Sequence, residues 1–141
     1  MNESPYQIIE RVPTMEEYTS LRESVGWPNM ADQPVKKGLG NALFSVCAMQ
    51  NDKVIGCGRV VDDGSIYFYV QDIIVHPDHQ GKGIGKRIMD TIMNYIHSVA
   101  EEGAFIGLMA AVDVDKFYQH YGFSKRPKNS PGMHMVIKQD T

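Results

Sequence analysis

The spacing of apolar residues along the chain predicts three helices. Over residues 14–25 they recur every three or four positions, and Thr14 and Glu17 stand at the spacing of a capping box. Over residues 84–100 four successive isoleucines are spaced four residues apart. A third, shorter helix is expected at residues 114–121, where aromatic side chains share helical spacing. Each helix would pack one apolar face against a core.

Shorter apolar or alternating segments, separated by turn residues, predict strands. The expected strands cover residues 6–12, 43–49, 54–61, 66–75 and 105–109, with closing strands at Phe123 and over residues 133–138. Residues 29–40 are polar and contain Pro34 and two glycines. A loop is therefore expected there, with room for a short helix over residues 34–39.

The order of these elements predicts the fold class. A strand and a helix precede three strands joined by turns, and a long helix then leads to a further strand, a helix and the closing strands. This order indicates an α/β (α+β) protein with a single domain over residues 1–141. The sheet is expected to be mixed and mostly antiparallel, with helices on both faces. Residues 66–109 would form a central, right-handed parallel crossover.

The charge balance narrows the class of partner. The 141 residues carry 14 Lys and Arg against 17 Asp and Glu, a net charge of −3, which argues against a nucleic-acid-binding protein. No apolar run approaches the ~18 residues that span a bilayer, and the N-terminal residues lack a basic start followed by an apolar run. We therefore expect a cytoplasmic protein with neither a membrane nor a nucleic-acid partner.

The thiol and imidazole groups predict little chemistry. Cys47 and Cys57 stand among apolar residues and are expected to be buried free thiols. His76 and His79 flank Asp78 in a loop, but the pair has no third and fourth ligand beside it. No metal is therefore expected.

Residues Gln80 to Lys86 form the most informative segment, because a glycine-rich loop follows a strand and opens a long helix. Glycines let successive backbone N–H groups point into one concavity, and the helix N-terminus adds the positive end of its dipole. Such a loop binds pyrophosphate. A Walker A loop is excluded because Gly83, not Ser or Thr, follows Gly81 and Lys82. A dinucleotide fingerprint is excluded because Lys86 stands where its third glycine belongs.

This segment resembles the Gln/Arg-x-x-Gly-x-Gly/Ala signature of the Gcn5-related N-acetyltransferase superfamily. Gln80, Gly83 and Gly85 occupy the key positions, and an apolar strand with a His-Pro pair precedes them. Residues 117–123 read Phe-Tyr-Gln-His-Tyr-Gly-Phe and resemble a second superfamily segment, Phe-Tyr-x-x-x-Gly-Phe. The order of elements matches that of the superfamily over essentially the whole chain.

The resemblance implies acetyl-CoA as co-substrate. The pantetheine arm would bind free backbone groups of a strand, and the N–H of Ile74 would stabilise the oxyanion. The glycine loop would hold the pyrophosphate. Tyr118 matches the tyrosine proposed to protonate the departing thiolate. The implied cofactor-binding residues are Ile73, Ile74, Val75, Gln80, Gly81, Lys82, Gly83, Ile84, Gly85, Lys86 and Tyr118.

The acceptor side follows from the chemistry of amines. An alkyl amine is mostly protonated at pH 7 and must lose a proton before it attacks. Asp72 is the candidate catalytic base, because a charged residue inside an apolar strand needs an explanation; a cap or a salt bridge is the alternative. Trp27, Tyr67 and Tyr69 would line the acceptor site or, alternatively, fill the core. Residues 110–113 lack an Asn that helps many family members to bind CoA.

A finer resemblance concerns residues 21–28, Asp72 and the pair Gly132 and Met133, which are similar to a subgroup that includes the plastid serotonin N-acetyltransferase-like enzymes. The predicted function is direct transfer of acetyl from acetyl-CoA to the primary amine of a small molecule. A protein or peptide acceptor and a catalytically silent CoA-binding module are the alternatives. A homodimer through an exposed edge strand near the C-terminus stays open.

Overall fold

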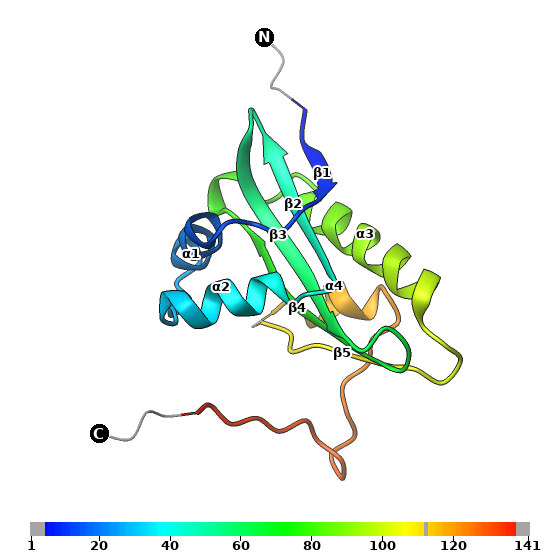
Figure 1. Ribbon diagram of the computed structural model, residues 1–141. Coiled ribbons are helices and arrows are strands. Elements are labelled where there is room, and N and C mark those ends of the chain that lie inside the picture. The colour runs from blue at the N-terminus through cyan, green and yellow to red at the C-terminus, as the bar shows by residue number, and fades with distance from the viewer. Residues whose placement is uncertain (1–4, 112, 138–141) are drawn as a thin grey trace. The chain divides into compact units, whose positions relative to one another are not determined.

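The computed structural model describes residues 5–111 and 113–137 (Figure 1). These residues form two compact units, one ending at Leu108 and the other beginning at Met109. The first unit holds a mixed sheet with helices on both faces, and the second holds one short helix. Each unit is described by itself.

The sheet of the first unit follows the order of the chain. From β1 to β4 the neighbours are antiparallel, and β5 lies parallel to β4. The strands are β1 (Gln7–Glu10), β2 (Phe44–Gln50), β3 (Lys53–Asp62), β4 (Tyr67–Val75) and β5 (Phe105–Gly107). The predicted fold class is confirmed. In the described part of the sheet, however, the parallel pair lies at one edge and not at the centre.

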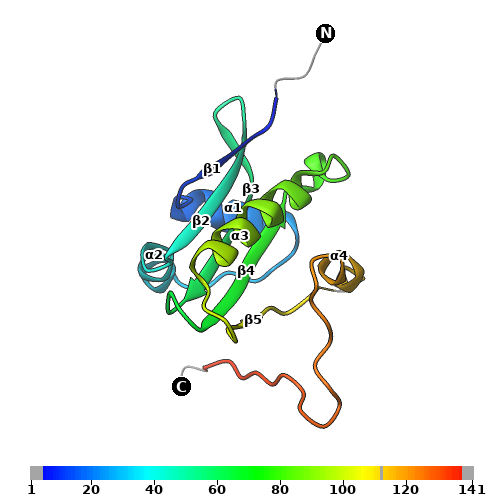
Figure 2. The same ribbon diagram turned by 90° about the vertical axis from the view of Figure 1, so that its right-hand side faces the viewer.

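Helices cover the two faces of the sheet (Figure 1, Figure 2). On one face lie α1 (Met15–Ser24) and α2 (Asp32–Gly40), and on the other lies α3 (Ile84–Val99). The four isoleucines of α3 are buried, and the helix packs against β1 to β4. A single 3-10 turn, η1 (Pro77–His79), connects β4 to α3. Among the described helices, none has the length and apolar character needed to cross a bilayer.

The local signals at α1 are confirmed, and α2 is longer than expected. The Thr14 side chain accepts a hydrogen bond from the N–H of Glu17 (3.1 Å), and the Glu17 carboxylate accepts one from the N–H of Thr14 (2.8 Å). In α2, Val35 and Leu39 are four residues apart and pack against Tyr18 of α1. This apolar stripe stabilises a helix where Pro34 and the glycines favour a loop.

The second unit corrects the prediction of closing strands. After α4 (Asp115–Gln119), the described residues up to position 137 contain no strand, so the strands predicted at Phe123 and over residues 133–137 are wrong. The Phe123 ring packs edge-on against Tyr118 instead, with centroids 6.2 Å apart. An alternating pattern predicts a strand only where a neighbouring strand supplies hydrogen bonds. Position 138 lies outside the described residues.

A β-bulge in β4 shapes the end of this strand. Arg59 of β3 faces Gln71, but Cys57 faces Ile74, so β4 has one more residue than β3 between these pairs. Asp72 lies in the bulge with φ +59°, in the left-handed region. Gly58 of β3 faces the bulge.

Gly58 lets β4 and α3 pack closely beyond the bulge. A Cβ at this position would lie 2.7 Å from Cδ1 of Ile73, 2.8 Å from Cγ2 of Ile88 and 2.9 Å from Cδ1 of Ile92. Ile88 and Ile92 are fully buried branched side chains, so they have little room to move aside. The absence of a side chain at position 58 is therefore a packing requirement.

Gly58→Ala should lower the free energy of unfolding by about 1–3 kcal/mol, because the added methyl overpacks this contact. Urea denaturation followed by circular dichroism measures the change. The control is Gly40→Ala at the end of α2, where an added Cβ meets no atom within 4 Å. Equal stability of the two variants would contradict the packing requirement.

Candidate active site

The C-terminal half of β4 has an open edge. Pairing with β5 covers only Tyr67 to Tyr69, which face Phe105 to Gly107. In Figure 2, β4 runs on beyond the short β5. From Val70 onward, β4 has no hydrogen-bonding neighbour on this side among the described residues of its unit. Its backbone N–H groups on that side face no neighbouring strand and suit an extended ligand.

The pairing with β3 determines which amides face the open edge. The N–H of His76 donates to the carbonyl of Ile55 (2.8 Å), so His76 and Ile74 direct their backbone groups toward β3. Ile73 and Val75 therefore direct theirs toward the open edge. The carbonyl of Asp72 confirms this direction, since it accepts from the Cys57 thiol (3.4 Å) and the next N–H points the opposite way. Ile74 is thus not among the amides that face this edge; those of Ile73 and Val75 are, and the part of any of them in stabilising the oxyanion stays a prediction.

The glycine loop leads directly into the first turn of α3. Gly81 and Gly83 have φ of +78° and +79°, and Gly83 is the N-cap of α3. In the described chain no side chain caps this helix, and the first N–H groups of a helix have no acceptor within the helix itself. The Gln80 amide donates to the carbonyl of Val75 (2.9 Å) and ties the loop to the end of β4. Strand edge and loop thus form one continuous surface.

The lysines of this loop have contacts within the protein. The Lys86 ammonium pairs with Asp90 (2.8 Å), and that of Lys82 lies 5.9 Å from the centroid of the Tyr6 ring. His79 also binds the Tyr6 hydroxyl (2.9 Å). Both lysines add positive charge at the N-terminus of α3.

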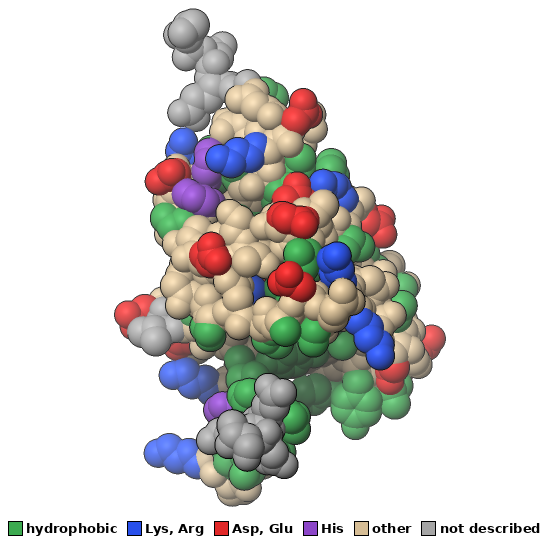
Figure 3. Space-filling view, turned by 60° about the vertical axis from the view of Figure 1, so that its left-hand side comes forward, with side chains coloured by type: hydrophobic (Ala, Val, Ile, Leu, Met, Phe, Trp, Pro, Cys, Tyr) green, Lys and Arg blue, Asp and Glu red, His purple; other side chains and the backbone are tan. Residues whose placement is uncertain are grey.

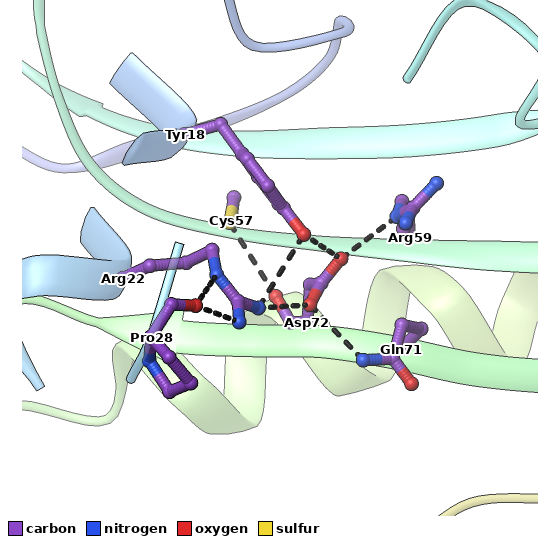
Figure 4. Close-up of polar contacts among 7 residues, drawn as sticks. All are labelled: Tyr18, Arg22, Pro28, Cys57, Arg59, Gln71 and Asp72. Atoms are coloured by element: carbon purple, nitrogen blue, oxygen red, sulfur yellow. Dashed lines mark hydrogen bonds and ion pairs between the residues drawn. The ribbon is translucent and has the colours of Figure 1, made fainter. Parts of the chain in front are cut away.

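Asp72 lies in a buried polar network with residues of α1 and β3 (Figure 4). Its Oδ2 accepts from the Tyr18 hydroxyl (2.8 Å) and from Nε of Arg59 (2.8 Å). Its Oδ1 accepts from Gln71 (3.0 Å) and from Arg22 (3.4 Å). The side chain is only 2% exposed.

The network bears on the role predicted for Asp72. Four donors occupy the four lone-pair positions of a carboxylate, so no oxygen faces an acceptor amine. This arrangement favours the alternative of a salt bridge over a catalytic base. Burial, and then the charge of Asp72, raise the pKa of Tyr18 to about 12, so its hydroxyl remains a donor at neutral pH.

The tyrosines of β4 lie on the same face of the sheet as the Asp72 network. Gln71 directs its side chain to Asp72, and the two-residue alternation along β4 places Tyr69 and Tyr67 on that face too. Tyr67 is 61% exposed, so it does not fill the core. The Tyr69 hydroxyl is buried and has no hydrogen-bond partner among the described residues. Burial and the charge of Asp72 raise the pKa of Tyr69.

Trp27 lies just beyond α1 on the same face. It packs against a buried cluster that includes Cys57 and Ile74, and the Arg22 guanidinium lies 5.5 Å from its ring centroid. The acceptor-site roles of Trp27, Tyr67 and Tyr69 stay predictions.

The outer surface over α1 and α2 carries acidic and basic side chains interspersed with one another (Figure 3).

Tyr118 belongs to α4 in the second unit. The rings of Phe117 and Phe123 contact it edge-on, with centroids 5.1 and 6.2 Å away. Burial raises the pKa of its hydroxyl, which keeps the proton that a general acid must donate. Its role as acid stays a prediction.

The sequence interpretation missed the partners of Asp72. Arg59 was available as a signal, because it is a charged residue in an otherwise apolar strand, just as Asp72 is. Tyr18 and Arg22 share one face of α1 at a spacing of four residues, but nothing in the sequence links them to Asp72. The prediction for Cys47 and Cys57 is confirmed, since both are free and buried, and burial raises the pKa of each thiol.

Comparison with known proteins gives the family. A family model described as an acetyltransferase (GNAT) domain matches residues 40–125. The chain belongs to the GNAT acetyltransferase family. It is therefore an acyltransferase, an N-acetyltransferase that uses acetyl-CoA as co-substrate.

Two sequence relatives and one solved structure show how similar this GNAT chain is to other proteins. An uncharacterized N-acetyltransferase ycf52 of Pyropia yezoensis is 32% identical over 83% of this chain and 68% of its own. The chloroplastic GCN5-related N-acetyltransferase 2 of Arabidopsis thaliana is 31% identical over 80% of this chain, which spans only 51% of that protein. The crystal structure of a Staphylococcus aureus protein of unknown function, described as a probable acetyltransferase, is 36% identical. It covers 94% of this chain and 100% of its own, with a TM-score of 0.89.

The site of this GNAT protein fits acetyl-CoA. The open amides of Ile73 and Val75 suit an extended pantetheine arm, which carries amide groups. The positive φ of Gly81 and Gly83 and the uncapped start of α3 suit a pyrophosphate. Adding a side chain to the loop tests this fit.

Gly83→Ala should weaken acetyl-CoA binding about tenfold or more, since Ala at positive φ is strained by roughly 1–2 kcal/mol and the loop amides shift to relieve it. Isothermal titration calorimetry measures the affinity. The control is Gly64→Ala in the turn between β3 and β4, where φ is +78° and an added Cβ also meets no atom within 4 Å. Equal loss of affinity in both variants would argue against the loop as the pyrophosphate site.

Proposed function

We propose that the protein transfers an acetyl group directly from acetyl-CoA to the primary amine of a small molecule. The observation that carries the proposal is the continuity of the open β4 edge with the glycine loop at the start of α3. A row of strand amides followed by a helix N-terminus matches an extended ligand that ends in a pyrophosphate. This surface supports a bound acyl donor next to the face that carries the three aromatic residues.

Different residues bind the donor, stabilise the oxyanion and donate a proton during the transfer. Bound acetyl-CoA supplies a thioester, whose acetyl carbon the neutral amine attacks. The amides of Ile73 and Val75 hold the arm, and one of them stabilises the negative charge on the acetyl oxygen. As the C–S bond breaks, the Tyr118 hydroxyl protonates the thiolate, and the amine proton leaves to solvent. Holding both substrates together supplies proximity, so no acyl-enzyme is needed.

Aromatic side chains support a small acceptor. Trp27, Tyr67 and Tyr69 offer flat apolar surfaces with polar tips on the face of the sheet that carries α1. A protein or peptide acceptor is the second candidate within the same chemistry. A CoA-binding module without turnover is the third.

Release of CoA thiol from acetyl-CoA, measured against a panel of amines, tests the proposal. The panel comprises arylalkylamines, polyamines, aminoglycosides, amino acids and short peptides. Turnover with one class of small amine supports the proposal, and turnover with peptides alone would replace it by the second candidate. Acetyl-CoA binding without thiol release on any amine would favour the silent module.

Tyr118→Phe should lower kcat about 10²-fold while leaving the affinity for acetyl-CoA unchanged, because only the proton donor is removed. Steady-state kinetics and calorimetry separate the two effects. Since burial raises the pKa of Tyr118 above its usual 10.0, the midpoint of the Tyr118-dependent fall in wild-type activity should lie above pH 10.

Tyr121→Phe is the matched control for this variant, because Tyr121 contacts the same Phe117 ring in the second unit. Its kcat should match that of the wild type. A Tyr118→Phe variant with unchanged kcat would remove Tyr118 from the mechanism.

A further inference from the structure

We propose that Asp72 is a positioning residue, whose ion pairs with Arg22 and Arg59 hold the β4 bulge and thereby direct the Ile73 amide into the open edge. The inference rests on the proposed binding of acetyl-CoA at that edge. It gives Asp72 a role in the reaction other than that of a catalytic base.

The backbone at Asp72 needs to be held in place. Its φ of +59° lies in the left-handed region, which L-residues other than Asn and Asp rarely adopt. With extended backbone at this residue, the two residues of β4 between the pairs Arg59–Gln71 and Cys57–Ile74 would no longer fit opposite one residue of β3. The side chain of Asp72 therefore acts at the one residue whose conformation creates the bulge.

The anchor comes from two elements on either side of the carboxylate. Arg59 extends from the neighbouring β3, and Tyr18 and Arg22 extend from α1. Each guanidinium is fixed at a second point. Arg59 donates to the carbonyl of Gly38 in α2 (3.3 Å), and Arg22 donates through Nε to the carbonyl of Pro28 (3.1 Å). The two guanidinium groups that bind the carboxylate are thus each fixed by a second hydrogen bond to a backbone carbonyl.

One peptide group links this anchor to the ligand site. The carbonyl of the Asp72–Ile73 peptide accepts from the Cys57 thiol, so its N–H faces the open edge. Rotation about the backbone of Asp72 turns this peptide group directly. A shift of the carboxylate is therefore transmitted to the donor at position 73 through a single residue.

The two roles of Asp72 predict different results for its partners. If Asp72 is the base, removing a donor frees a lone pair and should not lower kcat. If Asp72 is a positioning residue, removing a donor weakens acetyl-CoA binding although the carboxylate remains. Tyr18→Phe makes this distinction, because it deletes one hydroxyl and keeps the ring in its cluster with Val35 and Leu39.

The experiment measures acetyl-CoA affinity by calorimetry, with kcat from thiol release. Asp72→Asn keeps the size of the side chain and its tolerance of positive φ, but it loses the charge. We expect acetyl-CoA to bind about tenfold more weakly to Asp72→Asn and about threefold more weakly to Tyr18→Phe, with kcat lowered in both.

Glu17→Gln is the matched control. It breaks the ion pair of Glu17 with Arg11 (3.0 Å) at the start of the same helix and does not touch β4. Gln also preserves the capping box. Its affinity for acetyl-CoA should equal that of the wild type.

Each result decides between the roles. Loss of kcat in Asp72→Asn with unchanged affinity, together with a wild-type-like Tyr18→Phe, would overturn the inference and restore the base. If Asp72→Asn does not fold, unchanged affinity in Tyr18→Phe alone overturns it. A wild-type protein that does not bind acetyl-CoA would overturn the proposed function first, whereas selective loss in the variants leaves that function standing.

Discussion

Between two matched positions of the sheet, β4 contains one residue more than β3, and the site depends on how this extra residue is accommodated. The bulge, with Asp72 at positive φ, shifts the pairing of β4 with β3 by one residue, so that Ile74 faces β3 and the amides of Ile73 and Val75 face away from it. Gly58 gives the bulged strand room to pack on α3, and a buried carboxylate between two guanidinium groups lies at the bulge itself. The packing of Gly58 on α3 lies on one face of the sheet and the ion pairs of Asp72 lie on the other. Both act next to the peptide group between Asp72 and Ile73.

The surface proposed for acetyl-CoA consists mainly of backbone. Strand amides and the first turn of α3 supply the donors, and the side chain of Gln80 joins the two. Backbone donors recognise a constant ligand without constraining the sequence around them. Under the proposed function we expect side chains to select the acceptor, and Trp27 and Tyr69 are the predicted ones.

Signals that are local in the sequence predicted the fold well. The capping box at Thr14 and the isoleucine repeat of α3 depend on neighbours within one helical turn, and both elements have the expected bounds within two residues. The closing strand predicted over residues 133–137 is absent, because a strand needs a partner strand and the alternation of side chains does not show whether one is near. The role of Asp72 is equally non-local, since Arg22 lies 50 residues away. Whether the amide of Ile73 or of Ile74 faces the open edge depended on the register of the bulge, which is also non-local.

Hydrogen exchange at three adjacent amides tests the central claim most directly. In the free protein, the amide of Ile74 should exchange slowly because it is bonded to β3, whereas those of Ile73 and Val75 should exchange fast. Saturation with acetyl-CoA should slow exchange at Ile73 and Val75 and leave Ile74 unchanged. Exchange at Ile73 and Val75 that stays fast in the presence of bound acetyl-CoA would contradict the account.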